Sequence, residues 1–144
     1  MAKYVIGIDF GTLSGRAVVV NVKTGEEIGS AFYNYPHAVM DRELPDGTKL
    51  PMDYALQHPQ DYLDVFKNAV PEVLSRTQVD PADVIGVGVD FTACTVLPVK
   101  ADGTPMCFLD KYKNDPMAYV MMWKHHALRA YANKLTEIDR TARR

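Results

Sequence analysis

The chain has 144 residues, of which 47% are hydrophobic and 24% charged, and its formal net charge is -2. These values predict a globular domain with a core of its own. The slightly acidic balance gives no electrostatic reason to bind nucleic acid or an anionic membrane, and no apolar run is long enough to span a bilayer. Two cysteines do not make a disulfide framework, and the first residues show no apolar leader, so a cytoplasmic location is expected.

The most informative segment is residues 8–16, with the sequence IDFGTLSGR. It lies between two short apolar runs, which predicts a tight turn joining two β-strands. A turn with glycine, hydroxyl groups and a carboxylate can approach a polyphosphate closely and hold a hydrated magnesium ion. Asp9 is therefore the candidate for a water-mediated Mg2+ contact. The candidates for phosphate binding are Gly11, Thr12, Ser14 and Arg16. The alternative is an ordinary polar hairpin, in which the carboxylate accepts hydrogen bonds from turn N–H groups and the arginine lies on the surface.

The next elements follow in chain order. Residues 28–35 are expected to complete an antiparallel meander with strands at residues 4–8 and 17–20. Residues 36–57 contain prolines and a glycine without sustained periodicity, which predicts an irregular loop over one edge of the domain. No internal repeat is present.

A helix is expected over residues 59–76, with Pro71 as a potential bend or break. Its predicted core-facing stripe consists of Tyr62, Leu63, Phe66, Ala69, Val70, Val73 and Leu74. Residues 84–91 form a short apolar, β-branched run, which predicts a central buried strand parallel to the first strand. The chain continues with an expected strand at residues 95–99. Residues 117–123 fit either a strand or a helix, and residues 124–138 have helical spacing. This order predicts an α/β fold with a mixed sheet, in which the meander precedes helix-linked parallel strands.

A second polar cluster follows the strand expected at residues 84–91, at a strand end where α/β sheets tend to bind ligands. It combines an acid, two hydroxyls and a small residue that leaves room for a flat sugar. The candidates for sugar contacts are Asp90, Thr92, Ala93 and Thr95. Either threonine could instead satisfy nearby backbone groups. Further along, Trp123 is a candidate apolar wall for the sugar and Lys124 a candidate donor to a sugar oxygen, although a lone tryptophan is more often a core residue.

Three segments besides the phosphate turn resemble the ribulokinase branch of the FGGY carbohydrate kinase family. They are residues 55–62 (ALQHPQDY), 86–99 (GVGVDFTACTVLPV) and 123–127 (WKHHA). The phosphate turn alone would not separate this family from the actin, heat-shock ATPase and hexokinase group with ribonuclease H-like domains. Glycerol and xylulose kinases carry an Arg-Glu or Met-His pair in the loop that matches residues 91–95. This chain has neither, which leaves open which groups hold an open-chain ketose.

The resemblance implies a ribonuclease H-like mixed sheet and phosphorylation of L-ribulose to L-ribulose 5-phosphate in arabinose catabolism, with ATP and Mg2+. Family members bind ATP and the ketose between two domains, and their catalytic base and adenine site lie further along the chain than Arg144. Residues 1–144 are therefore expected to be an incomplete first domain, with the second domain absent and no activity alone. An uncovered apolar sheet edge would favour a homodimer. The alternatives are an actin- or heat-shock-type ATPase module and a non-catalytic interaction domain.

Overall fold

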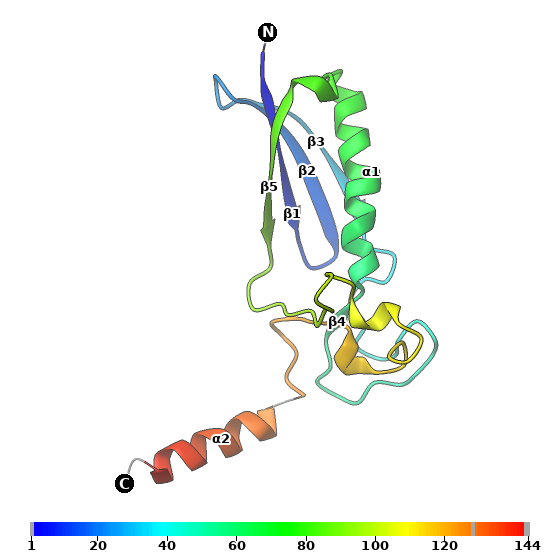
Figure 1. Ribbon diagram of the computed structural model, residues 1–144, viewed down its shortest axis with the longest axis vertical. Helices are drawn as coiled ribbons and strands as arrows, with labels where there is room; N and C mark the ends of the chain where they lie inside the picture. The colour runs from blue at the N-terminus through cyan, green and yellow to red at the C-terminus, as the bar shows by residue number, and fades with distance from the viewer. Residues whose placement is uncertain (1, 128, 143–144) are drawn as a thin grey trace.

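The computed structural model describes residues 2–127 and 129–142. Four strands form one mixed sheet in the order β3-β2-β1-β5 (Figure 1). The strands are β1 (Tyr4–Phe10), β2 (Ser14–Asn21), β3 (Glu27–Asn34) and β5 (Val84–Phe91). Strand β2 pairs antiparallel with both β1 and β3, and β5 pairs in parallel with β1. The predicted meander, mixed sheet and parallel strand are therefore confirmed.

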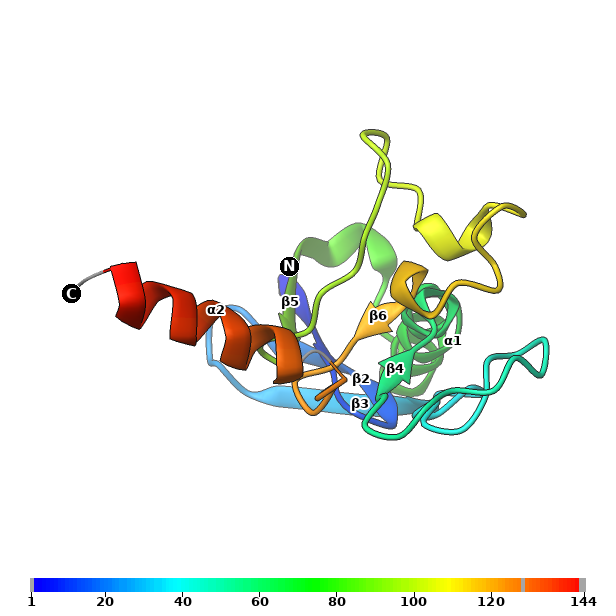
Figure 2. The ribbon, with the colours of Figure 1, turned by 90° about the horizontal axis from the view of Figure 1, so that it is seen from below.

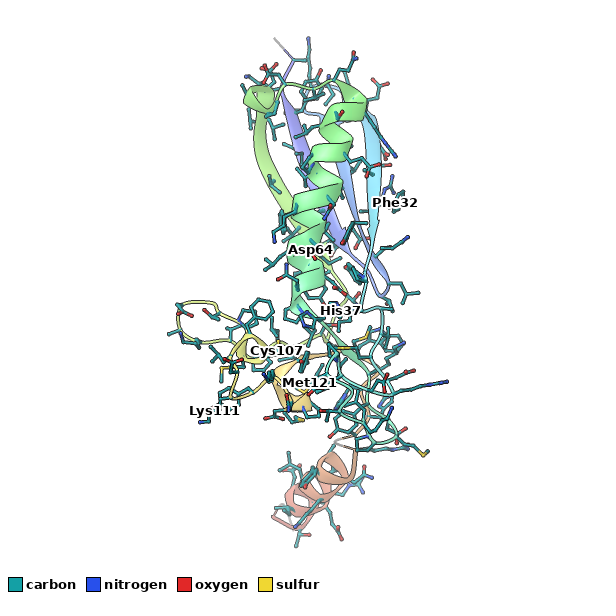
Figure 3. The ribbon with its side chains drawn as sticks, turned by 90° about the vertical axis from the view of Figure 1, so that its right-hand side faces the viewer. Phe32, His37, Asp64, Cys107, Lys111 and Met121 are labelled. Atoms are coloured by element: carbon teal, nitrogen blue, oxygen red, sulfur yellow. The ribbon has the colours of Figure 1, made fainter. Side chains whose placement is uncertain are left out.

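Helix α1 (Pro59–Thr77) packs on one face of the sheet, over β2 and β3 (Figures 1 and 3). It begins after His58, whose Nδ1 accepts a hydrogen bond from the Gln60 N–H at 3.2 Å, and it continues through Pro71 without a break. The core between helix and sheet consists of Ile6, Ile8, Ala17, Val19, Ala31, Tyr35, Val65, Ala69, Val73 and Val79. Alternate residues of β1 and β2 supply it, because side chains along a strand point to opposite faces.

The predicted stripe of α1 is confirmed at Ala69 and Val73 but is wrong at Leu63 and Phe66. These two side chains are 45% and 43% exposed, whereas Val65, outside the predicted stripe, is fully buried. The helix packs over β2 and β3, so its flank on the β1 side has less of the sheet to cover it. The helical period alone does not reveal which part of an apolar face the sheet covers.

Gly15 in β2 allows α1 to approach the sheet closely. A Cβ atom at this position would overlap both γ-methyl groups of the fully buried Val65. We expect Gly15→Ala to lower the free energy of unfolding by about 2 kcal/mol, because a packed core accommodates an added methyl group poorly. Urea denaturation measures this change. In a Val65→Ala background the same substitution should cost clearly less, and an equal cost in both backgrounds would contradict the overlap.

Strand β5 lies at the edge of the described sheet, so the prediction of a central buried strand is wrong. Ile85, Val87, Val89 and Phe91 are between 56% and 64% exposed. Within the described residues no strand pairs with the outer edge of β5, and α1, although on the same face as Val87 and Val89, packs over β2 and β3 and leaves β5 uncovered. An apolar run indicates a strand suited to burial, but the strand is buried only where other segments pack against it.

Residues 36–57 are not a loop over the sheet edge; they help to build a second, smaller core. Strand β4 (Leu56–Gln57) pairs antiparallel with β6 (Val120–Met121), as Figure 2 shows, and the pair lies beyond the end of the main sheet (Figure 1). Their cluster consists of Met40, Leu44, Leu56, Cys107, Ala118 and Tyr119. Single bridges pair Val96 with Met121 and Val99 with Pro105, in place of the strand predicted at residues 95–99. These contacts join segments that are far apart in the chain. The prolines and glycine on which the loop prediction rested carry no information about such distant contacts.

Short 3-10 helices at Pro81–Asp83, Met106–Phe108 and Pro116–Ala118 connect these elements. Helix α2 (Arg129–Ala142) projects from the rest of the molecule (Figure 1). It starts later than the helical spacing predicts, and Leu128, part of that spacing, lies outside the described residues. None of the helices described is both long enough and apolar enough to cross a membrane.

Candidate functional site

The turn between β1 and β2 is held by hydrogen bonds to its carbonyl groups. The Gly11 N–H donates to the Ser14 carbonyl at 3.0 Å, which closes the turn. Gln57 in β4 donates from Nε2 to the carbonyls of Gly11 and Thr12, at 3.2 and 2.8 Å. The Tyr35 N–H donates to the Leu13 carbonyl at 2.9 Å. The predicted phosphate turn is thus anchored by its carbonyls to neighbouring segments.

Asp9 and Asp90 lie side by side at the carboxyl ends of the parallel strands β1 and β5. They are register partners, and both are exposed. Ile8 faces the core, so the alternation of side chains places Asp9 on the face of the sheet opposite α1. An exposed carboxylate at a strand end, beside a turn with hydroxyl groups, suits a Mg2+ ion that keeps several of its waters.

Arg16 is the register partner of Asp9 on β2, but its guanidinium group is engaged along β3. It pairs with Glu27 at 2.8 Å and Ser30 at 3.2 Å, and it lies over the ring of Phe32. A phosphate contact would require this side chain to leave an exposed ion pair, which costs little. The predicted phosphate role of Arg16 stays a prediction.

The predicted sugar loop is tied to the same end of the sheet. Both the N–H and the Oγ1 of Thr92 donate to the Phe10 carbonyl, each at 3.2 Å. Thr95 donates from Oγ1 to the Ala93 carbonyl at 3.3 Å. Both threonines therefore satisfy backbone groups, as the alternative interpretation allowed. Between them, Cys94 adopts a left-handed backbone with φ of 56°, an unusual conformation for a residue with a Cβ atom.

Thr92 and Thr95 also line a cavity of about 230 Å³. Its walls are Phe10, Tyr62, Val89, Phe91, Thr92, Thr95, Leu97 and Val120. Apart from the hydroxyl groups of two threonines and the tyrosine this lining is apolar, so it offers few partners for the hydroxyls of a ketose. Polar contacts for a ketose in this cavity would have to come from other segments that pack against this end of the sheet, because Asp90, the register partner of Asp9, lies on the face opposite α1.

Trp123 and Lys124 follow β6, outside the set of side chains that line this cavity. Trp123 is 56% exposed, so within the described residues it is not a core residue. An indole ring left this exposed is available to contact a ligand or another segment.

Sequence reasoning missed a cluster at the start of α1, where Figure 3 labels His37: the buried Asp61 with two half-buried histidines, His37 and His58. The Asp61 carboxylate is fully buried; it meets Nδ1 of His37 at 2.6 Å and accepts the His37 N–H at 3.3 Å. The two imidazole rings stack with centroids 4.1 Å apart. Because His58 accepts the Gln60 N–H at Nδ1, its neutral ring carries its proton on Nε2 and has no free lone pair for a metal. The cluster is therefore a hydrogen-bonded junction.

His58 predicts a pH dependence of stability. Burial, and then the neighbouring His37, lower the pKa of His58 from 6.5 to about 4. Between these values the unfolded chain binds the proton more readily than the folded one, so stability falls as pH drops from 6.5 to 4, by at most about 3 kcal/mol. Urea denaturation across this range measures the slope. In His58→Asn, which keeps a capping acceptor without titrating, the slope should be smaller; an unchanged slope would contradict the role of His58.

Known proteins similar in sequence to this chain are found among the curated ribulokinases. No family model matches the chain. It is 55% identical over 137 residues to a ribulokinase from Geobacillus thermodenitrificans, covering 94% of this chain and 24% of the relative. It is 52% identical over 127 residues to a ribulokinase from Bacillus licheniformis, covering 88% of this chain and 23% of the relative. The chain therefore spans about a quarter of the length of these curated relatives.

Solved structures give the fold. A crystal structure of a xylulose kinase from Rhodospirillum rubrum superposes with a TM-score of 0.66 and 17% identity, covering 94% of this chain and 23% of that one. At this identity the likeness concerns the fold alone. The expected ribonuclease H-like architecture, of the type found in sugar kinases, is confirmed.

Proposed function

This chain belongs by sequence identity to the ribulokinases of the FGGY sugar kinase family, and from that premise we propose that the whole protein phosphorylates L-ribulose with ATP. The product is L-ribulose 5-phosphate, and the reaction serves arabinose catabolism. Residues 1–144 are proposed to form the N-terminal part of the first domain. Other parts of the protein then supply the adenine site and the catalytic base, so this chain alone is proposed to lack activity.

One observation carries the proposal beyond the sequence identity: the phosphate turn and the sugar loop meet at one end of two parallel strands. Thr92 at the end of β5 is hydrogen-bonded twice to Phe10 at the end of β1, directly before the turn. Phosphoryl transfer depends on positioning the acceptor hydroxyl in line with the γ-phosphate. A rigid link between the two loops supports such positioning.

The proposed division of roles follows from position. Asp9 would hold Mg2+ through water, at a position where the ion would supply positive charge to the transferred phosphoryl group. Backbone and hydroxyl donors of the turn bind the phosphates; they come from Gly11, Thr12 and Ser14, with Arg16 as a further candidate. The sugar contacts are proposed to come from Asp90, Thr92, Ala93, Thr95, Trp123 and Lys124.

The exposed apolar side chains of β5 support the proposal that the part of the α1 face formed by β5 is covered in the whole protein. Four large side chains of one strand, each more than half exposed, would otherwise leave an apolar patch and an open sheet edge. The remaining segments of the protein would cover it, or a second copy would do so in a homodimer.

The test is ADP release by the whole protein with magnesium and ATP, using L-ribulose, D-ribulose, xylulose and glycerol in turn. The proposal expects ADP release that depends on the sugar and is fastest with L-ribulose. Preference for another polyol would keep a sugar kinase but overturn the substrate. ADP release that does not depend on any sugar would favour the actin- or heat-shock-type ATPase module instead.

A further inference from the structure

Gln57 is a buried polar residue that is not among the residues proposed to contact the phosphates, the magnesium ion or the sugar. Its side chain is 1% exposed, so its amide must find all of its partners within the protein. Nε2 donates to the carbonyls of Gly11 and Thr12, and Oε1 accepts the hydroxyl of Tyr62 at 2.7 Å. Gln57 therefore connects the phosphate turn to the first turns of α1.

These contacts determine where the N–H groups of the turn point. A peptide group is planar and trans, so the carbonyl of one residue and the N–H of the next point in opposite directions. Gln57 draws the carbonyls of Gly11 and Thr12 toward itself, which directs the N–H groups of Thr12 and Leu13 away from it. Successive N–H groups turned outward form a concave site for an anion.

Tyr62 determines the orientation of the Gln57 amide. A glutamine amide could present either its oxygen or its nitrogen to the turn, and only the nitrogen can donate to two carbonyls. The Tyr62 hydroxyl donates to Oε1, which leaves Nε2 for the turn. Burial raises the pKa of Tyr62 to about 12, so its hydroxyl keeps its proton at physiological pH. Its ring is fixed by edge contacts with Phe10 and Tyr35.

We propose that Gln57, oriented by Tyr62, is a positioning residue that directs the N–H groups of Thr12 and Leu13 toward the phosphates of a nucleoside triphosphate. The inference rests on the proposed function, because it concerns the same phosphate turn. Gln57 in β4 and Tyr62 in α1 would thus influence nucleotide binding without contacting the nucleotide.

The test compares the affinity of the whole protein for a non-hydrolysable ATP analogue with its affinity for adenosine, which has no phosphates. Gln57→Leu should weaken binding of the analogue about 10-fold and leave adenosine binding unchanged, since two oriented donors are affected. Tyr62→Phe keeps the ring but removes the hydroxyl, and should weaken the analogue about 3-fold with adenosine again unchanged. Tyr62→Phe provides the result if Gln57→Leu does not fold.

The matched control is Thr77→Val, which removes a side-chain hydrogen bond to the Val73 carbonyl at the opposite end of α1. It should lower stability without changing the ratio of the two affinities. If the Gln57 and Tyr62 variants showed the same ratio of ATP-analogue affinity to adenosine affinity as the control, the positioning role would be wrong. Ketose-dependent ADP release by the unmodified protein tests the proposed function separately, so the failure of one is distinguishable from the failure of the other.

Discussion

Replacing Asp9 with asparagine in the whole protein is expected to lower kcat for ketose phosphorylation at least about 100-fold, and to raise the Mg2+ concentration needed for half-maximal rate. The carboxylate is exposed at the end of β1, beside the phosphate turn and away from the core, so its charge is available to a hydrated cation. Its removal should change the free energy of unfolding by no more than about 0.5 kcal/mol. ADP release at a series of Mg2+ concentrations, together with urea denaturation, measures both effects.

Asp102→Asn provides the matched control. It removes one carboxylate from a surface turn, where Asp102 contacts Lys100 and Thr104, and it changes the net charge equally. This variant should keep the original kcat and Mg2+ requirement. If Asp9→Asn behaved like Asp102→Asn in both respects, the magnesium role of Asp9 would be wrong, and the carboxylate would serve only the turn.

The sequence predicted best those elements whose signal is local. Alternating or continuous apolar runs bounded by turns identified β1, β2 and β3, and the apolar spacing after Pro59 identified α1. The parallel pairing of β5 followed from the helix that precedes it. The burial of β5 did not follow, because burial depends on which segments pack against a strand, and its own sequence does not contain that information.

For the site as well, features with a local sequence signal were predicted and features that depend on distant segments were not. The chemistry of the phosphate turn and the sugar loop was visible in short motifs, and the structure places them at neighbouring strand ends. The support of the turn by Gln57 was not visible, since the hydrogen bonds cross 45 and 46 residues of chain. Asp61 had a weak signal, an acid in the first turn of a helix, but that position is equally explained by the helix dipole.

His37→Ala is expected to lower the free energy of unfolding by about 3–5 kcal/mol, because it leaves a buried carboxylate without the imidazole that contacts it. Asp61 is fully buried, and its 2.6 Å contact with the His37 ring joins the segment after β3 to the start of α1. The His37 main-chain N–H, at 3.3 Å, is retained in the variant but does not replace the shorter contact of the ring. Urea denaturation of the whole protein at pH 7 measures the loss.

Asp61→Asn completes a double-mutant cycle that separates two roles of His37. If the contact between the imidazole and the carboxylate dominates, His37→Ala should cost at least about 1.5 kcal/mol less in the Asp61→Asn background, where no buried carboxylate is left without its partner. If the cost is the same in both backgrounds, His37 stabilises the fold through its stack on His58, and the argument from the Asp61 contact is wrong. The distinction matters for the site, because Asp61 precedes Tyr62, whose hydroxyl orients Gln57. A junction that holds the first turn of α1 thereby also holds the residues that orient the phosphate turn.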